Sequence, residues 1–271
     1  MRLDLHVHST ASDGACSPAE VVRLALAGRL DVIALTDHDT LAGLAEARRE
    51  ARGHAIEVVA AVELSSHWDE QDVHILGYFV DPAAPALRDH VARAATRRTE
   101  RMREMVDRLR DQDLEVRFED VLDIAGEGDT TLGRPHLARA LVQGGHVGSV
   151  GEAFDRYLGD GLPAHVPVRL GGPAEAVETV LAAGGVAVWA HPPLRLLDPL
   201  LPSLVSAGLR GLELHRPRTR PEVFERIEAA ARRHGLLVSG GSDWHGPDQG
   251  ELGDFYVTER DVEALLEAGG L

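Results

Sequence analysis

The sequence predicts an α/β protein built as a parallel barrel or a doubly wound sheet, with a helical segment inserted near its middle. Two observations carry this prediction. Short apolar runs of strand length alternate with helical patterns through most of the chain, which is typical of parallel sheets with crossover helices. Between residues 81 and 167 the alternation stops and only helical patterns remain. The 271 residues, 44% of them hydrophobic, suit one barrel-sized domain or a domain with an insertion.

Seven strands are expected from apolar runs bounded by polar, glycine or proline residues. They cover residues 2–6, 31–35, 57–62, 73–78, 186–190, 211–214 and 236–239. Only a short polar segment, SSHWDEQD (65–72), joins the third strand to the fourth. A parallel crossover needs about a dozen residues or more, so we expect the barrel to be irregular there.

Helices are expected in most of the connections between these strands. In the segment SPAE, Ser17 and Glu20 have the spacing of a capping box, and Gly28 is placed to end the helix. Another helix is expected over residues 221–234. It should end at Gly235, which can adopt the left-handed conformation of a helix C-cap.

The strand-free segment begins with a long charged helical pattern, DHVARAATRRTERMREMVDRLRDQD. A turn rich in Gly, Asp and Thr follows, and then GRPHLARALVQGG and GEAFDRYL. We expect several helices here without strands, which would form an inserted helical cap over residues 82–167. Arg97, Arg98 and Arg101 are expected to form a solvated face of the long helix, balanced by acidic residues at helical spacing.

Composition limits the functions that the chain can have. A net charge of -16 argues against a broad basic surface for long nucleic acid, although small anions remain possible beside metals or a local arginine cluster. Lysine is absent from the sequence, which excludes a lysine Schiff base and a carbamylated-lysine metal bridge. The single Cys16 excludes a disulfide framework and is expected to serve packing. No apolar run exceeds strand length and no leader precedes the first strand, so we expect a cytoplasmic protein without membrane spans.

The stretch LDLHVHSTASDG (3–14) places two histidines one residue apart at the end of a strand. Side chains alternate between the faces of a strand, so His6 and His8 point the same way. Their Cα atoms would lie about 6.6 Å apart, and both imidazoles could then reach one metal ion at about 2.0–2.1 Å. On this stretch alone, a polar strand end exposed to water remains the alternative.

Further residues of metal-binding type stand at the ends of the other expected strands. They are Asp13 on the loop after the first strand, Asp37 and His38 after the second, Glu63 after the third, His74 in the fourth, His191 after the fifth, and Asp243 and His245 beyond the seventh. Because α/β folds build their active sites at the carboxyl ends of strands, we expect these side chains to converge on one rim. The sequence therefore predicts a multinuclear metal site of histidine and carboxylate.

Taken together, these segments resemble the motifs of a known family. HVHSTASDG, ALTDHDT, AVELS, VHILGY, WAHP and GSDWHG are similar, in this order, to motifs of the polymerase and histidinol phosphatase (PHP) family of metal-dependent phosphoesterases. The similarity covers residues 1–81 and 168–250. The segment TLGRPHLARAL resembles the helical cap of the branch that contains nucleoside 3',5'-bisphosphate phosphatases and RNase AM-type exonucleases.

The resemblance implies a distorted seven-stranded (β/α)7 barrel, residues 1–81 and 168–271, with a helical cap at residues 82–167. It also implies two or three divalent metal ions, and the mixed ligands admit Mn, Fe or Zn. The implied ligand sets are His6, His8, Glu63 and Asp243 for one ion, Glu63, His74 and His191 for a second, and Asp13, His38 and His245 for a third. This chain departs from family patterns in having Asp13 where histidinol phosphatases often have histidine, and HPPLR in place of an HPGR-like segment.

The implied activity is hydrolysis of a phosphate monoester of a small nucleotide, foremost a nucleoside 3',5'-bisphosphate, to give the nucleoside 5'-monophosphate and phosphate. The nucleophile would be a metal-bound hydroxide held by Glu63 and Asp243. The alternatives are 5'-3' exoribonuclease activity on short 5'-phosphorylated RNA, histidinol phosphatase activity, and a non-catalytic metal-binding regulatory module. An amidohydrolase is a further rival, but its common lysine-bridged form needs a lysine. The expected partners are small phosphorylated nucleotides or short oligonucleotides.

Several other residues allow two interpretations. Arg134 and His136 in the cap are candidates to bind a substrate phosphate, although an arginine on a helix is usually solvated. His215, after the sixth strand, is either a general acid or substrate contact, or a structural residue. Asp37 would orient a ligand histidine or cap a helix. The remaining histidines are expected to bind no metal: His54, His67, His90, His146, His165 and His234.

Overall fold

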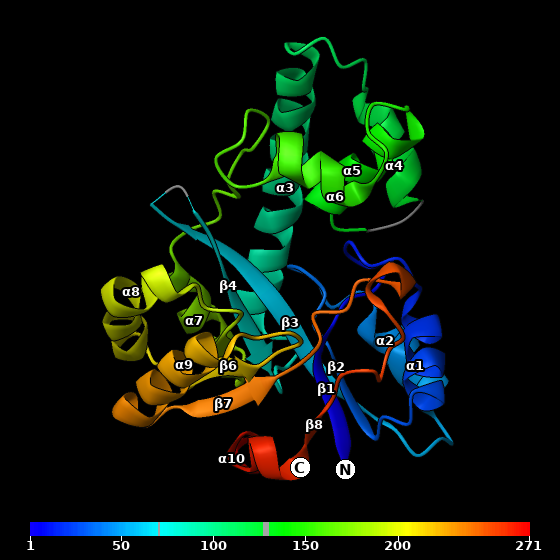
Figure 1. Cartoon of the computed structure of the whole chain (residues 1–271). Helices are drawn as coiled ribbons and strands as arrows, with labels where there is room; N and C mark the ends of the chain where they lie inside the picture. Colours follow the sequence, from blue (N-terminus) through cyan, green and yellow to red (C-terminus); the bar gives the residue numbers. More distant parts are fainter. Residues whose placement is uncertain (70, 127–129) are drawn as a thin grey trace.

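Eight strands form a single sheet in the computed structural model, which describes residues 1–69, 71–126 and 130–271. The strands are β1 (Arg2–Val7), β2 (Val32–Leu35), β3 (Glu57–Trp68), β4 (Gln71–Tyr78), β5 (Val186–Trp189), β6 (Gly211–His215), β7 (Leu237–Gly240) and β8 (Val257–Thr258). Their order across the sheet is β7-β6-β5-β4-β3-β2-β1-β8, so apart from β8 neighbouring strands are also consecutive in the chain (Figure 1).

The sheet curves into a nearly closed α/β barrel, as the sequence predicts. β1, β2 and β3 are parallel, as are β5, β6 and β7. An isolated bridge between Val7 and Trp244 brings the segment after β7 back to β1. The expected count of seven strands is wrong because β8 adds an eighth, paired antiparallel with β1. With only two residues, β8 is too short to produce a recognisable strand pattern in the sequence.

The expected irregularity between the third and fourth strands is confirmed. β3 and β4 pair antiparallel from Ala61–Tyr78 to Trp68–Gln71, and β4 is also antiparallel to β5. β3 extends to Trp68, six residues beyond its expected end, because the connecting segment itself joins the hairpin. Residue 70, within that segment, lies outside the described residues.

Helices connect the parallel strands and cover the sheet. They are α1 (Pro18–Ala27), α2 (Leu44–Ala51), α7 (Pro173–Ala182), α8 (Leu194–Ser206), α9 (Pro221–His234) and α10 (Glu259–Gly269), with the short 3-10 helix η2 (Pro247–Gln249). The predicted helix start at Ser17 and the helix ends at Gly28 and Gly235 are confirmed, whereas only the Ser17 half of the expected capping box is present. The Ser17 hydroxyl accepts a hydrogen bond from the Glu20 backbone N–H (3.2 Å), and Gly235 ends α9 with a left-handed φ of 63°.

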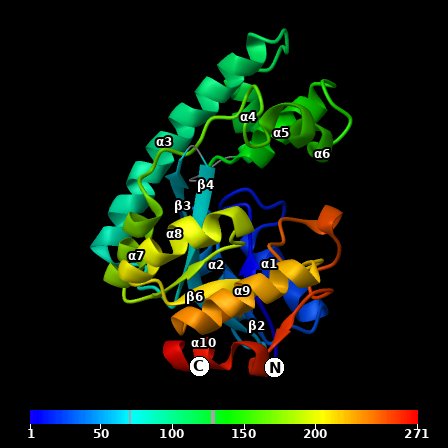
Figure 2. The ribbon, with the colours of Figure 1, turned by 60° about the vertical axis from the view of Figure 1, so that its left-hand side comes forward.

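Between β4 and α7 the described residues form helices and no strand. These are α3 (Pro85–Arg110), α4 (Phe118–Ala125), α5 (Arg134–Gln143), α6 (Val150–Ala153) and the π-helix η1 (Phe154–Leu158). They share an apolar cluster that includes Met102, Met105, Leu137 and Leu141. In Figures 1 and 2, α4–α6 lie beside the outer part of α3, at the end of the molecule opposite the two termini. The expected Gly, Asp and Thr-rich turn falls partly on residues 127–129, outside the described residues, and the boundaries of the helical cap stay a prediction.

Apolar clusters pack against the sheet from several sides and fix the strand ends that carry the polar residues. One cluster joins β1 and β2 to α1, and another joins β3–β6 to α7, α8 and α9. The Tyr78 hydroxyl on β4 donates to the Leu5 carbonyl on β1 (2.9 Å), which ties two strands that are not neighbours. Among the described residues, no helix has both the length and the apolar character needed to cross a bilayer.

Candidate metal centre

The side chains expected to bind metal meet around one cavity of about 440 Å³ at the carboxyl ends of the strands. The candidate ligands that line it are Asp13, His38, Glu63, His74, His191, Asp243 and His245. The two remaining candidates, His6 and His8, are fully buried and contact Glu63. Four arginines also line the cavity: Arg98, Arg101, Arg134 and Arg216.

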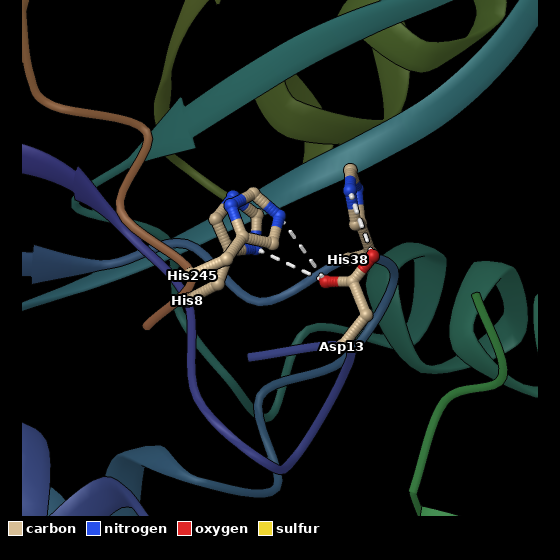
Figure 3. Close-up of side chains that lie close together, drawn as sticks. All are labelled: His8, Asp13, His38 and His245. Carbon is tan, nitrogen blue, oxygen red and sulfur yellow. Dashed lines mark ion pairs between the residues drawn. The ribbon is translucent and has the colours of Figure 1, made fainter. Parts of the chain in front are cut away.

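Three groups of these candidates bring ligand atoms within 4.8 Å of one another. The groups are His6, His8, Glu63 and Asp243; His8, Asp13, His38 and His245; and His38, Glu63 and His74. Figure 3 shows the second group, in which the Asp13 carboxylate points toward the surrounding imidazoles. Asp13 oxygens lie 3.4 Å from His245 Nε2 and 3.8 Å from His38 Nε2. His8 therefore belongs to both the first and the second of these groups.

Glu63 lies at the centre of the arrangement, and its two oxygens face different histidines. Its Oε2 atom lies 3.1 Å from His6 Nε2 and 3.2 Å from His8 Nε2. Its Oε1 atom lies 2.9 Å from both His74 Nδ1 and His191 Nε2. A carboxylate placed in this way can bridge two metal ions.

The local structure of β1 explains why two of these imidazoles meet. His6 and His8 point the same way, as the alternation of side chains predicts, and their Nε2 atoms each lie 3.4 Å from Asp243 Oδ1. The chain after β7 runs close beside β1, where the Asp243 backbone N–H donates to the His6 carbonyl (2.9 Å). Gly241 permits this approach, since a Cβ at that position would lie 2.4 Å from His6 Cβ.

The loop that carries Asp13 is held by Asp37. The Asp37 carboxylate accepts hydrogen bonds from the Ser9 backbone N–H (2.8 Å), the Ser9 hydroxyl (2.7 Å) and the Ser12 hydroxyl (2.7 Å). Neither sequence-based interpretation of Asp37 is correct. Its hydrogen-bond partners among the described residues include no histidine, and the next helix, α2, begins at Leu44 with Gly43 as its N-cap and no side-chain cap. Asp37 instead fixes the turn between β1 and Asp13.

The electrostatics of the cluster keep its carboxylates ionised. Burial raises the pKa of Glu63, but the charges of the surrounding histidines outweigh burial and hold that pKa well below its ordinary value. The same balance lowers the pKa of Asp13 and Asp243. Burial lowers the pKa of His8, yet the nearby carboxylates of Asp243 and Glu63 raise it to about 10. Burial lowers the pKa of His38 to about 3.

Several buried imidazole nitrogens in this cluster lack a hydrogen-bond partner among the described residues. They are both ring nitrogens of His8, Nδ1 of His38 and Nδ1 of His74. Unpartnered buried nitrogens are costly, and a metal ion satisfies them. Imidazole and ionised carboxylate are also the donors that divalent transition ions bind. The residues present therefore fit divalent metal ions.

Glu213 is part of the site although the sequence did not single it out. Its fully buried carboxylate on β6 lies 2.8 Å from His6 Nδ1 and accepts a hydrogen bond from the His191 backbone N–H (2.7 Å). A carboxylate in this position would hold the imidazole so that its other nitrogen is free to bind a metal ion. The feature of the sequence that could have identified Glu213 is its position near the end of the strand expected over residues 211–214.

The solvated face expected on the long helix is wrong at two of its three positions. Arg98 and Arg101 are buried and line the cavity. Arg98 Nε donates to Asp39 Oδ2 (2.7 Å), and Arg101 Nη2 donates to Asp72 Oδ2 (3.1 Å). Only Arg97 keeps the expected exposed ion pair, with Glu100. Positions three apart share one helix face, and here that face covers the barrel instead of solvent.

The two predicted phosphate-binding residues of the cap differ in their positions. Arg134 lines the cavity and donates from Nη1 to the Asp160 carboxylate (2.8 Å) and the Leu158 carbonyl (3.1 Å). His136 is buried outside the cavity lining. Its Nδ1 atom accepts a hydrogen bond from the Gly133 backbone N–H (3.0 Å), so it caps α5.

His215 is not brought into the cavity. Its ring packs edge to face on Phe224 of α9, with ring centroids 5.5 Å apart. The pairing of β6 with β7 shifts register between Glu213 and His215, which breaks the alternation that would have placed both on one face. We therefore assign His215 no part in the chemistry.

A further group of possible ligands lies beside the centre: Asp72, Asp160 and His165. Both carboxylates are already paired with guanidinium groups, Asp72 with Arg101 and Asp160 with Arg134. Two positive charges disfavour a cation at this point. We therefore leave His165 outside the proposed ligand sets.

Comparisons with known proteins agree with this geometry. The PHP domain family model matches residues 4–156. A 3',5'-nucleoside bisphosphate phosphatase of Chromobacterium violaceum is 36% identical over 92% of this chain and 88% of its own length, and a 5'-3' exoribonuclease of Haemophilus influenzae is 36% identical over 91% and 90%. A phosphoribosyl 1,2-cyclic phosphate 1,2-diphosphodiesterase of Eggerthella lenta is 35% identical over 90% and 94%.

A solved structure extends the likeness to the whole fold. A Bifidobacterium adolescentis protein described as a metal-dependent phosphoesterase superposes with a TM-score of 0.90 at 34% identity, and the match covers 98% of this chain and 96% of that one. The family match, the relatives that match over most of their length, and the clustered histidines and carboxylates support the same conclusion. The chain belongs to the PHP domain family and is a metal-dependent hydrolase of phosphate esters.

Proposed function

We propose that this enzyme removes the 3'-phosphate of a nucleoside 3',5'-bisphosphate and releases the nucleoside 5'-monophosphate and phosphate. The observation that supports this most directly is one cavity with two kinds of anion-binding group. Candidate metal ligands around Glu63 line one part of it, and the Arg134 guanidinium reaches it from α5. A substrate with two phosphates could place one phosphate beside the candidate metal ligands and the other beside Arg134. The relative named 3',5'-nucleoside bisphosphate phosphatase supports the same choice.

We propose the ligand sets that the family resemblance implies. His6, His8, Glu63 and Asp243 would hold one ion, Glu63, His74 and His191 a second, and Asp13, His38 and His245 a third. The groups of ligand atoms that lie within 4.8 Å of one another match the first set, but they add His8 to the third and place His38 beside Glu63 and His74. The two oxygens of Glu63, which face separate pairs of histidines, support its role as the bridge. The 3.4 Å separation of Asp13 and His245 supports the third set.

The chain's own residues orient this chemistry. When bound, such ions lower the pKa of water and neutralise phosphate oxygens during an in-line displacement. The Glu213 carboxylate accepts a hydrogen bond from His6 Nδ1–H, which leaves the lone pair on Nε2, the nitrogen that faces Glu63. Asp37 fixes the loop that presents Asp13. Water supplies the new oxygen on phosphorus, the bond from phosphorus to the 3' oxygen breaks, and no side chain becomes phosphorylated.

Arg134 is proposed to bind the phosphate that is not cleaved. A guanidinium can donate two parallel hydrogen bonds to a phosphate, and its charge is permanent. The present partners of Arg134 support an exchangeable position, because Asp160 is half exposed and the second carboxylate, Asp72, lies 3.7 Å away. An incoming phosphate would replace the Asp160 contact.

A second candidate function is exonucleolytic cleavage of short 5'-phosphorylated RNA. The observation that favours it is the relative named 5'-3' exoribonuclease, which matches over nearly the same span at the same identity. The net charge of -16 makes an extended path for long RNA unfavourable. Histidinol phosphate is a weaker candidate, because Asp13 stands where that branch often has histidine.

Purified enzyme tests the substrate directly. With a divalent ion added, phosphate release from a nucleoside 3',5'-bisphosphate is compared with mononucleotide release from a 5'-phosphorylated oligoribonucleotide. We expect the larger kcat/KM on the bisphosphate. A larger value on the oligonucleotide would replace the first candidate with the second.

Arg134→Ala tests the second phosphate site. We expect kcat/KM for the bisphosphate to fall on the order of 10- to 100-fold, because a charged hydrogen-bonded contact is lost, and kcat/KM for a simple aryl phosphate to change little. Arg97→Ala, which removes an exposed cap arginine, is the matched control and should leave both values unchanged. Equal losses on both substrates would assign Arg134 to folding or to the metal centre.

A further inference from the structure

Arg216 is the cavity arginine that comes from the barrel. It directly follows β6, whereas Arg98 and Arg101 belong to α3 and Arg134 to α5. Its side chain is about one-third exposed (35%) and lines the same cavity as the candidate ligands. The sequence did not single it out, and neither the ligand sets nor the second phosphate site uses it.

Among the residues that the structure describes, the guanidinium of Arg216 donates no hydrogen bond. Its nearest acceptors are Glu213 Oε2, 3.6 Å from Nε, and Asp243 Oδ2, 3.9 Å from Nη2. Both distances exceed a hydrogen bond, and the buried Nε has no partner among the described residues. The other three cavity arginines all donate hydrogen bonds to carboxylates or carbonyl groups.

These distances argue against a purely structural ion pair. An arginine that serves as the counter-ion of a buried carboxylate normally forms short, often bidentate hydrogen bonds of about 2.7–2.9 Å. Arg216 instead lies near Glu213 and Asp243 without a hydrogen bond to either, and its side chain lines the cavity. A buried donor without a partner is unfavourable, so an incoming acceptor would be bound well.

We propose that Arg216 is a catalytic residue that binds the phosphoryl group being cleaved. Asp243 is a proposed metal ligand, so a phosphate held by the ions beside it comes within reach of the guanidinium. Arg216 would donate to non-bridging oxygens of that phosphate and keep its own proton while the bond from phosphorus to the ester oxygen breaks. Charge that grows on these oxygens in the transition state strengthens the contact. This inference rests on the proposed metal ligands and not on the identity of the nucleotide.

Arg216→Ala and Arg216→Gln test the proposal, with Arg220→Ala as the control. Arg220 is three-quarters exposed (75%) in the same loop region, and its loss should change nothing. Three quantities are measured on each protein: kcat/KM for an aryl phosphate and for the bisphosphate, the dissociation constant of inorganic phosphate, and the metal content by elemental analysis. The Gln variant keeps a polar side chain of intermediate length in case the Ala variant folds poorly.

We expect both Arg216 variants to lose on the order of 10- to 100-fold in kcat/KM on both substrates, the scale of a lost hydrogen bond between charged groups. Phosphate binding should weaken and metal content should stay equal to that of the unchanged enzyme. Arg216→Lys should recover part of the loss, because it restores the charge without the planar fork.

Three outcomes would overturn the proposal. A fall in metal content with unchanged phosphate affinity per loaded enzyme would make Arg216 a positioning residue for Glu213. A loss confined to the bisphosphate would move Arg216 to the second phosphate site. Unchanged kinetics would leave it no role. Because aryl phosphate and inorganic phosphate lack a nucleoside, these results stand even if the nucleotide substrate proves to be different.

Discussion

Glu63 is almost completely buried (1% exposed), and among the described residues its charged partners are histidines and not arginines. Its neighbours are imidazoles, whose positive charge depends on protonation. When a cation replaces those protons, the same geometry is held with the charges satisfied in a different way. The carboxylate is thus more dependent on the bound ions than on any protein cation.

Glu63→Ala should therefore reduce activity far more than loss of a peripheral carboxylate such as Asp69. In the proposed ligand sets it disrupts two ion sites at once, so we expect a decrease in kcat of at least about 100-fold and a lower metal content. Asp69→Ala should retain close to full turnover, because Asp69 stands exposed at the tip of the β3–β4 hairpin. Similar turnover in both variants would contradict the bridging assignment.

The buried pair of Asp39 and Arg98 is a second residue-scale feature with a measurable effect. Asp39 accepts hydrogen bonds from Arg98 Nε (2.7 Å), His90 Nε2 (2.8 Å) and the Ser65 backbone N–H (2.7 Å). Asp39→Asn fits the left-handed φ of 53° but removes the charge. We expect the free energy of unfolding at pH 7, measured with urea, to fall by about 3 kcal/mol or more, because Arg98 stays buried without its counter-ion.

The pH dependence of that difference provides a check. Burial raises the pKa of Asp39, but the charge of Arg98 and the hydrogen bonds outweigh it and hold the pKa well below its ordinary value of 3.8. The ionised carboxylate therefore stabilises the folded state above about pH 4, and this stabilisation is lost as the pH falls further. The gap between Asp39→Asn and the unchanged protein should shrink below pH 4. Glu100→Ala, which removes an exposed partner, should cost less than about 1 kcal/mol at any pH.

Whether the sequence reveals the role of a residue depends on how far along the chain its partners lie. The candidate ligands His6 and His8 were recognisable because residue type and position at a strand end are both visible in the chain. Glu213 and Arg98 were not, because their partners are distant: 207 residues separate Glu213 from His6, and 59 separate Arg98 from Asp39. Whether a helical side chain faces solvent or the barrel depends on which element packs against that face of the helix, and the sequence does not give this packing.

At the scale of elements, the segment after β7 has to pass very close to β1 for Asp243 to reach His6. Gly241 is the point of closest approach, and a side chain there would collide with the backbone N and the Cβ of His6. The strand positions themselves followed from apolar runs, whereas β8 and the extension of β3 did not, because both depend on pairing with a neighbouring strand.

Gly241→Ala tests this close approach. The added methyl group would lie 2.4 Å from His6 Cβ, so we expect a loss of about 1–3 kcal/mol in the free energy of unfolding together with a lower metal content. Gly172→Ala is the control, because the position before α7 has open space for a Cβ. Equal metal content and stability in the two variants would show that the strands can separate without disturbing the ligands.

At the scale of the whole molecule, the proposed centre joins segments from both ends of the chain, so bound ions should stabilise the complete barrel. We expect two or three divalent ions per chain by elemental analysis. Removing them with a chelator should abolish phosphatase activity and lower the melting temperature, since a ligand at 100 times its dissociation constant contributes about 2.7 kcal/mol. At most one tightly bound ion, with no gain in activity on adding manganese, would contradict the three ligand sets.

The order of the strands has a consequence for synthesis on the ribosome. β1 to β7 are hydrogen-bonded in chain order, so the barrel can grow strand by strand as the polypeptide emerges, with β5 following only after the helices from α3 to α7 have been made. Asp243 and His245 emerge almost last. A nascent chain that already presents His6 and His8 therefore still lacks Asp243 and His245, so the proposed centre should be complete only when most of the chain has been made.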